Sequence, residues 1–320
     1  MGFLTKYGSF WGDIPETTGS VFFVSPTANY TIEGKAYAAS NDNDGLSPER
    51  AVLTIANAIL KATASVGDVI VLLPGTHTSS TQVAVNKAGL TFIGVHPSHR
   101  IAPKIRNHPP TTKVSWTSTF AGVAVALTVA DCTFYGINFI PVTAQTFMTG
   151  TTCPGTLFSD VTVTLSAAAS VNTKGVVFSG GSSQFVTFMN CYFINSVATS
   201  AQGPALDLTG CADFILDNVK VFLKGTSSAW AVTIQLGAGS SGQIINSHIS
   251  AMGVGTITIG VDGTGVAVAN AVLLTNNFYG VSPGAGAVKN LTNANVGIVN
   301  NYYGVIGGTA GGGVVQTITL

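Results

Sequence analysis

The sequence predicts an all-β protein built as a parallel β-solenoid, in which every turn of the chain adds one strand to each of several stacked sheets. Three observations support this fold class. Only 8% of the 320 residues are charged, whereas a soluble domain usually has about 25%. A large apolar residue, followed two positions later by Asn, Asp or Gly, recurs mostly every 24 to 30 residues. Only one segment has the apolar spacing of a helix.

The composition excludes several classes of protein. Hydrophobic residues make up 46% of the chain, which is enough apolar side chain for a folded core. The 13 basic and 13 acidic residues balance, so the chain lacks the net positive charge that nucleic-acid binding favours. The longest apolar runs are far shorter than the roughly 18 residues of a membrane-spanning helix. We therefore expect neither nucleic acid nor a membrane as a partner.

The charges are concentrated near the N-terminus. Residues 1–113 hold 16 of the 26, and the remaining 207 residues hold ten. Such a body cannot depend on charged helix faces for solubility. Its many Ser, Thr, Asn and Gly residues favour strands joined by polar turns.

Neither the N-terminus nor the cysteines carry a recognisable motif. The first residues, MGFLTKYGSFWGDIP, lack the apolar stretch and cleavage site of a signal peptide. The cysteines are widely spaced and contain no CxxC pair, which favours buried free thiols over a metal or redox site. We expect no metal and no cofactor. The four cysteines are Cys132, Cys153, Cys191 and Cys211.

One helix is predicted over about residues 48–66. Ser47 suits the N-cap, and Pro48 suits the first helical position. Apolar residues then recur at helical spacing until Gly67, a stop signal. A short buried strand, Val69–Leu73, follows and ends at a Pro-Gly turn.

The repeat follows that strand. After a first gap of 42 residues, its spacings are 24, 30, 27, 29, 30 and 24. A β-sandwich, with strands every 8–12 residues, is the alternative, but it does not explain a period near 27. About nine coils would make a rod roughly 40 Å long. The recurring apolar residues are Phe92, Phe134, Phe158, Phe188, Ile215, Ile244, Leu274 and Ile298.

The turn residues of the repeat are predicted to form a ladder. Stacked coils place equivalent positions about 4.8 Å apart. Asn tolerates left-handed backbone, and its amide can bond to the next amide along the stack. The predicted ladder consists of Asn190, Asp217, Asn246, Asn276 and Asn300.

The chain divides into three predicted parts. Residues 1–38 form an N-terminal arm or attachment segment, and residues 39–306 form the β-solenoid with its helix. Residues 307–320 form a Gly-rich tail, whose last residues are β-prone and could add a strand to a neighbouring chain.

Residues 40–78 resemble the pectin-lyase-like right-handed β-helix family. They contain a DG turn, a Pro-started helix with the letters TIANAI, and then GDVIVLLPGTH. The resemblance implies a right-handed parallel β-helix over about residues 36–305, with the helix capping its N-terminal end. The family includes polysaccharide enzymes, phage tailspikes and non-enzymatic virion proteins. The segment GSFWGDIPETTGSVFFVSP is also similar to β-helix proteins of tailed phages.

Two carboxylates are the candidates for catalysis. Asp160 and Asp217 occupy equivalent repeat positions two coils apart, about 9–10 Å, near the upper limit for an inverting glycosidase pair. Their slot otherwise holds Asn or Gly, so a turn role explains them equally well. No Arg occurs after Arg106, which weighs against a pectate-lyase site.

Residues 96–113 form a basic segment without an acidic residue. It could dock onto an acidic protein surface or an anionic glycan, or be only a loop made soluble by its charges. The candidate docking residues are His96, His99, Arg100, Lys104, Arg106 and Lys113. The DNDG run at residues 42–45 suggests calcium, but its spacing does not fit an EF-hand loop, and a turn stabilised by Asx side chains is the alternative.

Two functions are compatible with these features. The first is a non-enzymatic virion protein of a tailed phage, a head decoration or knob, made in the host cytoplasm and assembled as a homotrimer on the major capsid protein or another virion protein. The second is a tailspike-like protein that binds or cleaves host surface glycan, with aromatic platforms such as Tyr279 or Tyr302. A secreted lyase is disfavoured because no signal peptide is visible.

Overall fold

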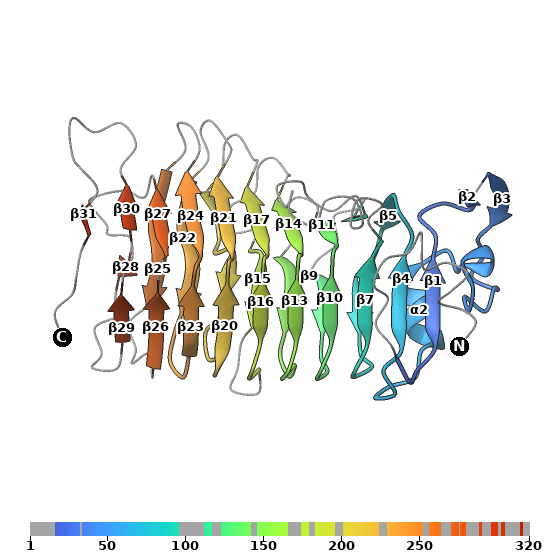
Figure 1. Cartoon of the computed structure of the whole chain (residues 1–320), viewed down its shortest axis with the longest axis horizontal. Helices are drawn as coiled ribbons and strands as arrows, with labels where there is room; N and C mark the ends of the chain where they lie inside the picture. Colours follow the sequence, from blue (N-terminus) through green and yellow to red (C-terminus); the bar gives the residue numbers. More distant parts are fainter. Residues whose placement is uncertain are drawn as a thin grey trace.

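The protein is a rod of stacked coils in which three parallel sheets run side by side along the long axis (Figure 1). The computed structural model describes residues 17–32, 34–95, 112–116, 123–141, 146–165, 174–178, 183–195, 201–223, 229–251, 256–263, 270–274, 276–279, 288–289, 296–299, 302–304 and 314–315.

Each sheet collects one strand from every coil. Sheet I contains, in order, β1 (Val21–Val24), β4 (Val69–Leu72), β7 (Thr91–Gly94), β10 (Thr133–Tyr135), β13 (Leu157–Ser159), β16 (Thr187–Met189), β20 (Phe214–Asp217), β23 (Ser241–Ile245), β26 (Asn270–Leu274) and β29 (Val296–Val299). Sheet II contains β5 (Thr76–Ser79), β8 (Lys113–Trp116), β11 (Asn138–Ile140), β14 (Thr162–Leu165), β17 (Tyr192–Asn195), β21 (Lys220–Leu223), β24 (His248–Ala251), β27 (Asn277–Tyr279), β30 (Tyr302–Gly304) and β31 (Val314–Val315).

Sheet III completes each coil. It contains β6 (Val83–Val85), β9 (Val123–Leu127), β12 (Thr146–Gly150), β15 (Val176–Phe178), β19 (Leu206–Asp207), β22 (Ala229–Leu236), β25 (Thr256–Gly263) and β28 (Val288–Lys289), with β18 (Ala201–Gln202) paired beside β22. Every strand of the coils pairs in parallel with its counterpart in the next coil. The predicted parallel β-helix is therefore confirmed, and the sandwich alternative is excluded. Among the described strands of the three sheets, β31 at the C-terminal end of sheet II is the exception, because it pairs antiparallel with β30.

The coil begins earlier than the boundary predicted at residue 39. β1 pairs in parallel with β4, so the segment predicted as a separate arm contributes the first strand of sheet I. A hairpin, β2 (Asn29–Ile32) and β3 (Lys35–Ala38), follows it. Residues 1–16 of the predicted arm lie outside the described residues.

The predicted helix over residues 48–66 is wrong in its bounds. Two short helices replace it: η1 (Pro48–Arg50), a 3₁₀ turn, and α2 (Ile55–Lys61). Between them Val52 is extended, because its backbone bonds to Phe23 and Ser25 at the edge of sheet I. Ser47 precedes only η1. The N-cap of α2 is Thr54, whose hydroxyl accepts from the Asn57 amide.

Two charged side chains hold α2 to the coil. The buried Asp68 carboxylate accepts from the backbone amides of Ser20 and Thr63, both at 2.6 Å. It thereby ties the start of β1 to the exit of α2. The Lys87 ammonium donates to the carbonyl oxygens of Leu60 and Ala62 at the C-terminal end of α2. A cation there also complements the helix dipole.

The main core is a column inside the coil, and a second, smaller buried cluster around Phe23, Val69 and Val71 lies near the N-terminal end. The centre of the column is a stack of phenyl rings from sheet I, where Phe92, Phe134, Phe158 and Phe188 occupy the same position in four successive coils. Neighbouring centroids are 5.0, 5.0 and 4.5 Å apart, with nearly parallel rings. Identical residues therefore stack upon themselves, as the repeat predicts.

The four cysteines are buried free thiols, as predicted. Burial raises the pKa of Cys132 and Cys153 to about 11 and that of Cys191 and Cys211 to about 12. The thiolate is the reactive form of cysteine, so these groups behave as small core side chains.

Candidate functional site

Asp160 and Asp217 do not form a pair in one column. Asp160 occupies the left-handed bend after sheet I, with φ 54°. The equivalent bend two coils further on is held by Asn218, while Asp217 is the last residue of β20 and pairs with Met189. Each carboxylate has a local partner, Ser159 Oγ for Asp160 at 3.0 Å and Asn246 Nδ2 for Asp217 at 3.2 Å. The placement favours the turn interpretation.

The turn ladder exists, but two of its predicted members are wrong. The left-handed slot holds Gly136, Asp160, Asn190, Asn218 and Asn246 in successive coils, with φ between 52° and 65°. Asn218 Nδ2 donates to Asn190 Oδ1 at 2.8 Å, the amide contact expected of a ladder.

The register explains both errors. Phe188 pairs with Leu216 rather than with Ile215, and Ile244 pairs with Leu273 rather than with Leu274. In these two coils, the predicted apolar residue lies one position away from the residue that pairs with its counterpart in the coil before. Such a slip exchanges the inner and outer faces of a strand.

Asn276 has a different role from the one predicted. It is buried one position beyond the ladder slot, where Oδ1 accepts from the Ser247 amide and Nδ2 donates to Ile244 O, both at 2.8 Å. Asn300 lies outside the described residues.

The basic segment is described only at its end. Lys113 is the exposed first residue of β8, where its amide bonds to Gly75 O. The other predicted docking residues, His96, His99, Arg100, Lys104 and Arg106, lie outside the described residues.

The side chains of Asn41 and Asp44 stabilise turns. This agrees with the turn interpretation, which is the alternative to the calcium hypothesis. Asn41 Oδ1 accepts from the amides of Leu53 and Thr54, at the start of α2. Asp44 Oδ1 accepts from the Leu46 amide and its other oxygen pairs with Arg50 at 3.1 Å. Within the described residues, no group of three or more His, Cys, Asp and Glu side chains is arranged to hold a metal.

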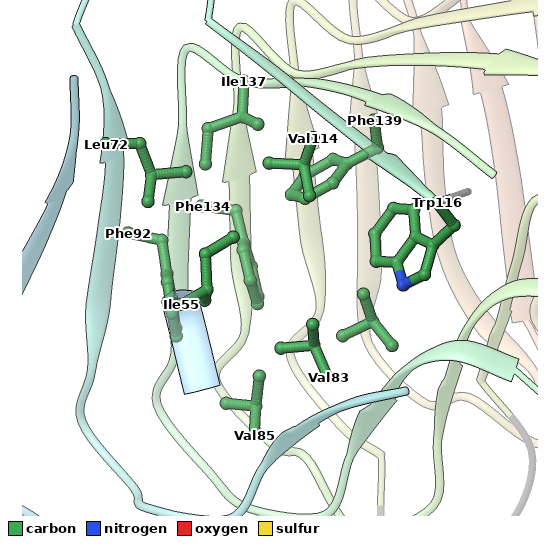
Figure 2. A pocket seen from close by; sticks show the side chains of 11 residues that line it. Ile55, Leu72, Val83, Val85, Phe92, Val114, Trp116, Phe134, Ile137 and Phe139 are labelled. Atoms are coloured by element: carbon green, nitrogen blue, oxygen red, sulfur yellow. The ribbon is translucent and has the colours of Figure 1, made fainter. Parts of the chain in front are cut away.

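A small cavity lies beside the ring stack in the interior. It measures about 20 Å³ and lies near the α2 end of the coil. Figure 2 shows Ile55, Phe92, Phe134 and Trp116 around the same interior space. All its lining residues are apolar, so it is a packing gap with no polar group to orient a ligand.

His77 lies inside the coil rather than at the end of a turn. It is buried in β5 and pairs with Val114, at the beginning of an inner column of sheet II. Its Nε2 lies 2.8 Å from Leu73 O, while Nδ1 has no hydrogen-bond partner. Burial lowers the pKa of His77 to about 4, so the ring is neutral at physiological pH.

The outer face of sheet II carries an aromatic and cationic group that the repeat alone did not reveal. Tyr192, Lys220 and His248 stack in adjacent coils. Lys220 Nζ donates to Tyr192 Oη at 3.0 Å and lies 4.9 Å from the ring centroid. Phe222 lies beside both rings, 6.3 Å from Tyr192 and 5.7 Å from His248. Burial, and then Lys220, lower the pKa of His248. A sugar is a polar ligand with hydrophobic faces. Tyrosine, lysine and neutral histidine side chains on one face of a sheet can contact such a ligand.

The outer face of sheet I carries exposed apolar side chains. Phe185 is 59% exposed, Met189 40% and Ile215 38%. They come from the adjacent strands β16 and β20 and from the bend before β16, in the middle of the rod (Figure 1). We call these three residues the Phe185 patch. An alignment of the coils on the stacked phenylalanines would have indicated Phe185, because the equivalent residues in neighbouring coils are Gly or Asp.

Comparison with known proteins extends to fold only. No protein-family model and no curated protein matches the chain. A pectin methylesterase in complex with a hexasaccharide aligns over 93% of this chain and 92% of its own, with a TM-score of 0.49 and 11% identity. The sheet topology of this chain is that of a parallel β-helix.

Two phage-derived structures also align. The product of an open reading frame of Geobacillus virus E2 aligns over 78% of this chain with a TM-score of 0.35 and 13% identity. A full-length tailspike protein 2 from an Escherichia coli bacteriophage aligns over 93%, with a TM-score of 0.34 and 11% identity. The alignments cover 56% and 46% of those two longer chains. In the described part of this chain, no helix is long and apolar enough to cross a membrane.

Proposed function

We propose that this protein is a non-enzymatic structural component of a tailed-phage virion, a decoration or knob protein on the exterior of the head. The observation that carries the proposal is the outer face of sheet I, which exposes apolar side chains on a body with very few charges. Such a face suits burial against other protein, since exposed contiguous apolar surface commonly marks an interaction site. The phage-like N-terminal sequence supports the same assignment.

The proposed assembly is a homotrimer of parallel rods, seated on the major capsid protein or on another virion protein. Side-by-side packing would bury the neutral flanks. The few charges, concentrated in the first third of the chain, would remain for contact with a different surface.

Mass spectrometry of purified, washed particles of the phage that encodes the chain tests the proposal. We expect the protein at a fixed ratio to the major capsid protein, which serves as the internal standard. A density map of the particle should then place rods on the head exterior. Loss of the protein on washing, with the capsid protein retained, would refute the proposal.

A tailspike-like glycan-binding protein is the second candidate, favoured by the Tyr192, Lys220 and His248 group on sheet II. Its test is binding of host surface polysaccharide, with Tyr192→Ala compared against Tyr37→Ala at the hairpin. Affinity reduced only by Tyr192→Ala, without release of oligosaccharides, would support binding alone. Release that depends on Asp160 or Asp217 would instead support catalysis.

A further inference from the structure

Phe185 occupies a backbone position that disfavours its side chain. It lies three residues before the stacked Phe188, at the bend that leads into sheet I, and its φ is 56°. The equivalent position in neighbouring coils, all with φ between 54° and 71°, is held by Gly89, Asp131, Gly155 and Asp213. Left-handed backbone costs a residue with a Cβ roughly 1–2 kcal/mol, and Gly, Asn and Asp tolerate it best.

Within the described part of the chain, no contact compensates for this strain by burying the ring, which is 59% exposed. Phe185 is the most exposed of the large apolar residues described in the coil, and Met189, four residues further along the chain, and Ile215 in the next strand are also exposed. The other large exposed apolar residues of the described part, Leu46, Leu60 and Val66, all belong to the N-terminal cap region. A strained, exposed aromatic within an apolar group is the arrangement expected of an interface anchor.

The surroundings of the Phe185 patch are acidic. The strands of sheet I from β10 to β23, with their adjoining bends, contain four charged residues and no Lys or Arg. All four are aspartates: Asp131, Asp160, Asp213 and Asp217. The complement of this surface is therefore a segment that combines cations with apolar side chains.

The chain itself contains such a segment. Residues 96–113 have four Lys or Arg, three His, two Ile and no acid. The segment leads from β7 to β8, and β7 lies three strands from β16 in sheet I, about 14 Å along the axis. Eight extended residues span roughly 26 Å. A segment that leaves one rod and returns after this length can therefore reach a position about 14 Å further along a second, parallel rod.

We propose that the Phe185 patch binds the basic segment 96–113 of a second copy of this chain, with Phe185 as the apolar anchor and the flanking aspartates as partners of the cations. The inference rests on the proposed function only for the expectation that copies assemble.

Phe185→Asn separates strain from binding. Asn suits left-handed backbone, so the melting temperature of the variant should rise by about 2–4 °C. Its self-association, measured by sedimentation velocity, should weaken about tenfold or more. The matched control is Leu60→Asn, which removes another exposed apolar side chain, on α2, and should leave self-association unchanged.

A charge reversal tests the occupant of the patch. Replacing Arg100, Lys104 and Arg106 by Glu should weaken self-association, whereas Lys61→Glu on α2 should not. Raising the salt from about 0.05 M to about 0.5 M should also weaken association of the unmodified protein, because the Debye length shortens.

Three results would overturn the inference: an unmodified protein that stays monomeric, a Phe185→Asn variant that assembles like the unmodified protein, or a charge-reversed variant that does so. These outcomes are distinct from failure of the proposed function. A monomer found on washed particles would refute the inference and the homotrimer but not the virion role, and an assembling protein absent from particles would refute only the virion role.

Discussion

The stacked phenylalanines contribute most where one ring is enclosed by two others. Phe158 is buried between Phe134 and Phe188, with ring centroids 5.0 and 4.5 Å away. Phe158→Ala should lower the free energy of unfolding by about 3–5 kcal/mol, because it removes the buried ring and leaves a cavity in a close-packed column. Denaturant titration measures this change. Phe222→Ala, on the half-buried outer face, should cost clearly less; equal losses would contradict the importance of the stack.

His77 makes stability depend on pH. Its pKa is about 4 in the folded protein and 6.5 when exposed, so the unfolded chain binds more protons between these values. The contribution is fully present above pH 6.5 and falls as the pH decreases towards 4, by about 3 kcal/mol in total.

His77→Val should remove this part of the pH dependence, since Val is the residue that follows in the same inner column at position 114. Unfolding free energies of the variant and the unmodified protein, measured from pH 7 to 4, give the difference directly. His248→Gln, which changes a half-exposed histidine, should alter the profile less. Parallel profiles for His77→Val and the unmodified protein would show that the ring is not held neutral by burial.

At the scale of one element, the bend after sheet I needs both a left-handed backbone and a side-chain amide. Asn218→Gly keeps the conformation but loses the bond to Asn190, whereas Asn218→Ala loses the bond and strains the backbone. We expect the Ala variant to be less stable than the Gly variant by about 1 kcal/mol. Thermal unfolding of the two variants measures this difference. Equal stability would show that the backbone conformation at the bend contributes little.

At the scale of the whole molecule, we expect the contacts between α2 and β1 to protect the N-terminal end of the coil, because an open sheet edge can pair with another chain. Asp68→Ala removes the acceptor of two backbone amides that join β1 to α2, which should cost about 3 kcal/mol. It should also increase aggregation measured by light scattering. Asp44→Ala, which breaks an exposed ion pair with Arg50, is the control and should change little. A soluble, fully stable Asp68→Ala variant would refute this protective role.

Much of the architecture was predictable from local pattern. The period, the phenylalanine column and the left-handed bends at Asp160, Asn190 and Asn246 follow from which residues recur, since each coil repeats the environment of the one before it. The segment at 215–218 was not predictable in the same way. Ile215 with Asp217, and Leu216 with Asn218, both fit the motif, and only pairing with Phe188 and Ile244 selects the second.

The sequence alone determined the kind of fold, because side-chain type and turn chemistry repeat along the chain and specify a coil with an apolar interior. The tertiary structure decided the register, the splitting of the N-terminal helix and the separation of Asp160 from Asp217. It also decided that Phe185 faces outward. The physical reason is that side chains alternate between the two faces of a strand, so a shift by one residue exchanges the faces, and only contacts between coils select the register.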